Sequence, residues 1–91
     1  MAKIKGKTES GFSFNVDENI GDDMLFFEML RKMDKGDVLV LPNVLEKMLG
    51  EAGKESLYKH LITEDGRVPI TAISTEIEEI FNLMGEKGKK S

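Results

Sequence analysis

Residues 12–30 read FSFNVDENIGDDMLFFEML, and the spacing of the apolar side chains changes once along this stretch. Up to Val16 the apolar residues alternate with polar ones, which is the period-two pattern of a half-buried strand. From Asp22 onward the apolar residues recur at the three- and four-residue spacing of an amphipathic helix. The change of period predicts an α+β chain in which strands come first and helices follow.

The residues before this stretch complete a predicted β-hairpin over about residues 3–16. Its strands are expected at residues 4–8 and 12–16, joined by the three-residue loop 9–11. Gly11 suits the end of that loop because glycine adopts positive φ without steric cost. An isolated hairpin is marginally stable in water, so its apolar face must pack on helices. That face consists of Phe12, Phe14 and Val16.

Helices are predicted for most of the remaining chain, and the fold is therefore expected to be mainly helical. Asp22 or Asp23 can cap the first helix, Gly36 follows its end, and Gly50 closes the second. The expected helices span residues 22–33, 38–49 or 42–49, 51–62 and 69–84.

Residues 38–41 have two interpretations at the level of sequence. Their residue types, VLVL, are compatible with a strand, and they are equally compatible with the first turn of a helix. Pro42 is tolerated at a helix start, so the helix begins at Pro42 at the latest.

The length and composition suit one domain. Residues 1–84 are expected to form a single globular domain. Residues 85–91 read GEKGKKS, with two glycines and no apolar side chain, and are expected to form a disordered tail.

The composition also argues against several classes of protein. There is no cysteine, so disulfides and thiolate zinc sites are excluded. The basic N-terminus is not followed by an apolar stretch, and no run approaches the roughly 20 apolar residues of a membrane span. The net charge is −4, whereas phosphate binding requires clustered lysines and arginines. We therefore expect neither a membrane nor nucleic acid as a partner.

The first predicted helix has a wide apolar surface. At 100° per residue, one stripe is flanked on opposite sides by Leu25 and Phe27, and the apolar arc covers about 200°, where a surface helix needs about 100°. The stripe consists of Phe26, Met29, Leu30 and Met33. The last helix differs, because its isoleucines form one narrow stripe and its glutamates, Glu76, Glu78 and Glu79, are expected to form a solvated face.

Two interpretations of the wide arc remain open. The favoured one is that the hairpin covers one flank of the helix and the other helices cover the second. The alternative is that a flank is exposed and binds another chain, or a second copy in a dimer or ring. In that case the candidate partner-binding residues are Leu25, Phe27 and Met24.

Residues that could perform chemistry are sparse. The single histidine, His60, has no cysteine or second histidine with which to bind zinc, and it is expected to be an ordinary surface or boundary residue. The acidic residues from Asp17 to Asp23 do not have calcium-loop spacing and suit capping instead. We therefore expect no catalytic, metal-binding or cofactor-binding residues, and no enzymatic activity.

Four segments together resemble a known family. They are KTESGFSFNVDE at 7–18, DDMLFFEML at 22–30, GDVLVLPNVLEKMLGE at 36–51 and LITEDGRVPITAISTEIEEIF at 61–81. In this order and spacing they resemble small tail assembly chaperone proteins encoded by long-tailed phages and prophages of Gram-positive bacteria. The resemblance covers residues 3 to 84, and no single motif in it is diagnostic.

The resemblance implies a non-enzymatic protein in the bacterial host cytoplasm. Such chaperones bind the tape measure protein, keep it soluble before the tail tube polymerises around it, and then leave the assembly. An alternative is a structural tail component, similar to a connector or terminator subunit, that is retained in the virion. A less favoured alternative is a small DNA-binding regulator, in which residues 42–49 and 51–62 mimic a helix-turn-helix despite the acidic charge of the chain.

Overall fold

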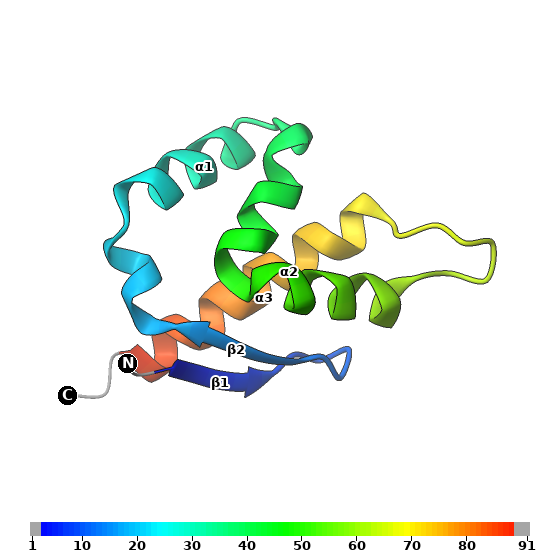
Figure 1. The fold of residues 1–91 in the computed structure, drawn as a ribbon, viewed down its shortest axis with the longest axis horizontal. Helices are drawn as coiled ribbons and strands as arrows, with labels where there is room; N and C mark the ends of the chain where they lie inside the picture. The colour runs from blue at the N-terminus through cyan, green and yellow to red at the C-terminus, as the bar shows by residue number, and fades with distance from the viewer. Residues whose placement is uncertain (1–2, 89–91) are drawn as a thin grey trace.

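The computed structural model describes the backbone of residues 3–88 and the side chains of residues 3–85. An antiparallel hairpin is followed by helices, which confirms the prediction of a mainly helical α+β fold. The elements are β1 (Lys3–Lys7), β2 (Ser13–Asp17), the 3-10 helix η1 (Glu18–Asp22), α1 (Met24–Asp34), the 3-10 helix η2 (Val38–Val40), α2 (Leu41–Leu61) and α3 (Ile70–Gly88). Figure 1 shows the hairpin at the bottom, α2 and α3 crossing above it, and α1 at the upper left.

The hairpin has the predicted face and turn. Ile4 lies opposite Val16, and Gly6 lies opposite Phe14. Gly11 has a φ of +96°, and its N–H donates to the carbonyl of Thr8 over 2.9 Å. The side chains on the apolar face of β2 are buried because β2 packs on α2 while β1 packs on α3.

Local capping interactions define both ends of α1. The Asp23 carboxylate accepts hydrogen bonds from the backbone N–H groups of Leu25 and Phe26, so Asp23 rather than Asp22 is the N-cap. At the other end Gly36, with a φ of +92°, donates to the carbonyl of Met33. Together with a hydrogen bond from the next N–H to the carbonyl of Lys32, this is a Schellman motif.

Residues 38–41 are helical, so the strand interpretation is wrong. Val38–Val40 form η2, whose N-cap Asp37 accepts a hydrogen bond from the N–H of Leu39, and α2 begins at Leu41. The predicted second and third helices are the two parts of α2, residues 41–49 and 51–61. They meet at Gly50, whose φ of +77° and ψ of 170° are not helical. The helix count therefore differs from the prediction because the two helices join directly at this glycine.

Helix α3 follows Pro69 and buries Ile73, Ile77 and Ile80 as the sequence predicts. It continues to Gly88, beyond the predicted end. The predicted tail 85–91 thus overlaps the helix at 85–88, and its remaining residues lie outside the described part of the chain.

The expectation that Glu76 belongs to a solvated face is wrong. Its side chain is buried, and its Oε1 accepts a hydrogen bond of 2.8 Å from the Thr8 hydroxyl. Glu79 is half-buried and accepts a hydrogen bond from the N–H of Glu9, whereas Glu78 is exposed as expected. The hairpin turn docks on this side of α3, so the helix is covered on two sides rather than one.

Candidate interaction surface on helix α1

Helix α1 exposes three large apolar side chains. Met24, Leu25 and Phe27 are 66%, 67% and 62% exposed, whereas Phe26 between them is 2% exposed. The interpretation that neighbouring elements cover both flanks of this helix is therefore wrong. Exposed apolar side chains grouped on one element are typical of sites that bind another chain.

The burial of Phe26 explains why its neighbours are exposed. The ring of Phe26 packs against the ring of Phe81 from α3, with centroids 5.7 Å apart and a tilt of 44°. This contact, together with packing on α2 and the short 3-10 helices, fixes the rotation of α1. The hairpin, which the sequence suggested as a cover for α1, packs on α2 and α3 instead.

Leu25 and Phe27 do not form one surface. They are separated by about 200° around the helix, so they point to opposite sides of α1. A partner helix lying along α1 can therefore contact only one of these two side chains closely. The surface around each side chain indicates which one is the better binding site.

The surroundings favour Phe27, because a surface hollow lies on either side of it along the helix. One hollow, of about 310 Å³, lies toward the start of the helix, and its lining is Gly21, Asp22, Asp23, Met24 and Phe27. The second, of about 420 Å³, lies toward the end of the helix, and its lining is Phe27, Leu30, Arg31, Met33, Asp34 and Phe81. We refer to these two hollows and their lining as the Phe27 groove.

The sequence predicted only part of this groove. The predicted residues Phe27 and Met24 lie in it, whereas Leu25 lies on the other flank. Phe81 was assigned to the core stripe of the last helix and was missed as a groove residue. No signal in the sequence places Phe81 beside Phe27, because their proximity depends on where the rest of the chain positions α3.

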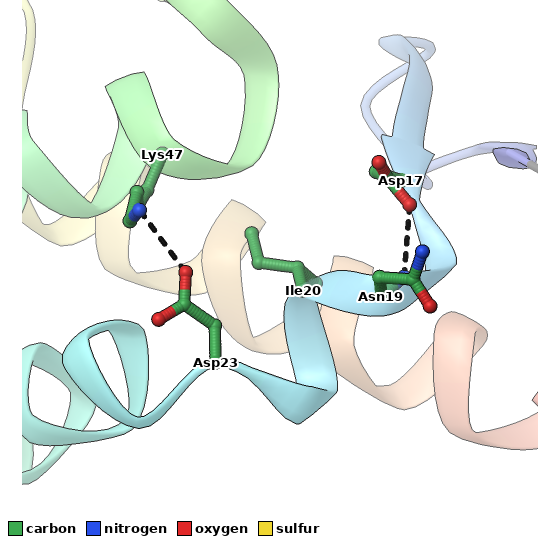
Figure 2. Close-up of a pocket in the computed structure, with 5 residues that line it drawn as sticks. All are labelled: Asp17, Asn19, Ile20, Asp23 and Lys47. Carbon is green, nitrogen blue, oxygen red and sulfur yellow. Dashed lines mark hydrogen bonds and ion pairs between the residues drawn. The ribbon is translucent and has the colours of Figure 1, made fainter. Parts of the chain in front are cut away.

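Another hollow, outside the Phe27 groove, lies near the start of α1 and is lined mainly by polar residues. It has a volume of about 190 Å³, and Figure 2 shows its lining: Asp17, Asn19, Ile20, Asp23 and Lys47. Lys47 lies 3.0 Å from the carboxylate of Asp23, and the hydrogen bond from Lys47 lowers the pKa of Asp23 below its ordinary value. Asp17 accepts a hydrogen bond of 2.9 Å from the N–H of Asn19. Both carboxylates thus cap helices, as the sequence predicts for this acidic stretch.

A smaller apolar hollow of about 170 Å³ lies between α2 and the start of α3. Its lining is Val38, Leu41, Pro42, Leu45, Tyr58, Val68, Ile70 and Ile73. Ile70 is 54% exposed, although the sequence assigned it to the buried stripe. This surface was not predicted, because the same isoleucine spacing fits a helix whose first turn is left uncovered.

His60 takes part in holding the hairpin turn. It is exposed, and its Nε2 lies 2.9 Å from the carbonyl oxygen of Ser10 and 3.1 Å from the Ser10 hydroxyl. Its ring also lies beside that of Phe12, with centroids 5.9 Å apart. Within the described residues, no group of three or more histidine and carboxylate side chains is placed to hold a metal ion. None of the helices in this part of the chain is long and apolar enough to cross a membrane.

Comparisons of this chain with models of protein families, with curated proteins and with solved structures gave no match.

Proposed function

We propose that this chain is a non-enzymatic tail assembly chaperone that binds the tape measure protein through the Phe27 groove in the cytoplasm of a bacterial host. The observation that carries the proposal is the exposure of Phe27, at 62%, between two hollows on the same side of α1. The resemblance of the sequence to tail assembly chaperones supplies the class of partner.

The groove suits an amphipathic helix. Such a helix binds by placing apolar side chains, spaced three and four residues apart, into hollows along an apolar surface. The Phe27 groove offers two hollows along one helix, and Leu30, Met33 and Phe81 supply apolar lining in the larger one. The tape measure protein is expected to be long and largely helical, so it offers many segments of this kind.

The small size of the groove favours a reversible complex. Interfaces well below about 1,200 Å² of buried surface are typical of weak or transient association. A chaperone that leaves before the tail is complete needs contacts of this modest strength. Several copies bound along one long chain can together keep it soluble without any single tight interface.

Co-expression with the tape measure protein from the same gene cluster tests the proposal. The wild-type chain should increase the soluble fraction of that protein and co-purify with it. The variant Phe27→Asp should fold but lose this effect, since it places a charge in the centre of the groove. Ile62→Asp is the matched control, because Ile62 is 52% exposed at the end of α2 and outside the groove.

Two results would contradict the proposal. One is a tape measure protein that stays insoluble with the wild-type chain, and the other is equal rescue by wild type and Phe27→Asp. Mass spectrometry of purified phage particles separates the chaperone from a retained structural component. The chaperone should be missing from finished particles, and its stoichiometric presence there would favour the structural alternative.

A further inference from the structure

The exposed surface of α1 carries opposite charge at its two ends. Asp22, the last residue of η1, is exposed and lines the smaller hollow of the Phe27 groove. Arg31, in the last turn, is exposed and lines the larger hollow. Lys32 and Lys35 add positive charge at the same end, and they outnumber Asp34, which also lines the larger hollow.

Phe27 lies between these two charges, because its side chain lines both hollows. At a rise of about 1.5 Å per residue, Arg31 lies about 6 Å along the helix axis beyond Phe27. Asp22 lies in η1, on the other side of Phe27, across Asp23 and Met24. A surface with an apolar centre and opposite charges on either side can pair with a second copy of itself after a rotation of 180°.

We propose that a second copy of this chain docks on the Phe27 groove, with the two α1 helices antiparallel around a two-fold axis near Phe27. In this arrangement Asp22 of each copy lies against Arg31 of the other copy, and the two Phe27 side chains meet at the axis. Because a two-fold interface uses the same patch twice, both charge pairs form together.

The dimer should be weak. Helix α1 has 11 residues and is therefore about 16 Å long, so two such helices side by side bury less surface than a standard stable interface. Its formation should depend on protein concentration and decrease with added salt, since exposed charge pairs are screened. The proposal does not depend on the identity of the protein partner, although a helix bound in the groove would exclude the second copy.

Sedimentation equilibrium with two charge-reversal variants tests this arrangement. The wild-type mass should rise from 10.2 kDa toward twice that value as the concentration approaches the millimolar range. Asp22→Arg alone and Arg31→Asp alone should each remain monomeric, because each places like charges opposite one another at both ends of the interface. An equimolar mixture of the two variants should dimerise again, since every contact between the unlike copies regains opposite charges.

Lys59→Asp is the matched control, because Lys59 is an exposed cation on α2, outside the groove, and its reversal should leave the dimer unchanged. Circular dichroism of each variant establishes that the helical fold is retained. A wild-type chain that stays at 10.2 kDa throughout would overturn the proposal. So would a dimer that both single variants preserve, or a mixture of variants that remains monomeric. None of these results depends on the tape measure protein, so they leave the proposed function to its own test.

Discussion

The Thr8 hydroxyl donates a hydrogen bond of 2.8 Å to Oε1 of Glu76, and this contact joins the hairpin to α3 across 68 positions of sequence. Both side chains are buried, at 4% exposed each. Thr8 Oγ1 also accepts a hydrogen bond from the N–H of Phe12, so the same hydroxyl closes the hairpin turn. The contact is therefore both a turn interaction and a polar link between the hairpin and α3.

Replacing Thr8 by valine should lower the free energy of unfolding by about 1–3 kcal/mol. The substitution preserves the shape of the side chain but leaves the buried Glu76 carboxylate without its donor. Urea unfolding measures the change. Ser13→Ala, an exposed change on the paired strand, should have an effect within about 0.5 kcal/mol. An equally small effect of Thr8→Val would show that water can replace the hydroxyl at this carboxylate.

Gly6→Ala should destabilise the hairpin by about 1–3 kcal/mol, because a Cβ at this position would lie 2.7 Å from Cζ of Phe14. The Phe14 ring is buried against the helices and would have to shift within the core. Gly21→Ala is the control, since a Cβ there meets no atom within 4 Å. Thermal unfolding of the two variants should show a lower midpoint for the first alone. Equal midpoints would mean that the ring moves without cost.

Replacing either of two glycines, Gly50 or Gly85, by alanine should change the free energy of unfolding, in opposite directions. Gly50→Ala should cost about 1–3 kcal/mol, because the φ of +77° and ψ of 170° at this position are accessible mainly to glycine. Gly85→Ala, in α3, should stabilise the protein by about 0.5–1 kcal/mol, because its Cβ meets open space and alanine favours the helix. Urea unfolding curves measure both effects. A neutral Gly50→Ala would show that α2 can straighten at this point.

Lys47→Met should raise the pKa of Asp23 toward its ordinary value, because the hydrogen bond from Lys47 is the main cause of its lowered pKa. With a lowered folded pKa, Asp23 contributes stability that is present above its unfolded pKa and lost as the pH falls through the folded pKa. The variant should therefore lose less stability on acidification than the wild type.

Carboxyl chemical shifts measured by NMR during a pH titration report this change. Asp65 is the internal control, because its pKa is lowered mainly by the hydroxyl of Thr63 and does not depend on Lys47. An Asp23 pKa that stays low in the variant would assign the shift to the hydrogen bonds that this carboxylate accepts from backbone N–H groups.

The candidate surface was only partly predictable from the sequence. The helical wheel showed that α1 has more apolar side chains than one buried stripe requires, and it indicated Leu25 and Phe27; Met24 was predicted alongside them. It could not show that two hollows lie beside Phe27, on the flank opposite Leu25. The larger hollow depends on Phe81, which belongs to α3.

The sequence by itself determined the elements whose signals are local. Alternation along residues 12–16 and the glycines at 11, 36 and 50 act through neighbours a few residues away, and each has its predicted place. The helix cap is local too: the sequence limited it to Asp22 or Asp23, and the structure has Asp23. The tertiary structure decided which surfaces are covered. The hairpin packs on α2 and α3, and so it buries Glu76 and leaves Phe27 exposed. Periodicity predicts which side chains share a face of a helix. Whether that face is buried depends on which other element packs against it, and only the packing of the whole chain determines that.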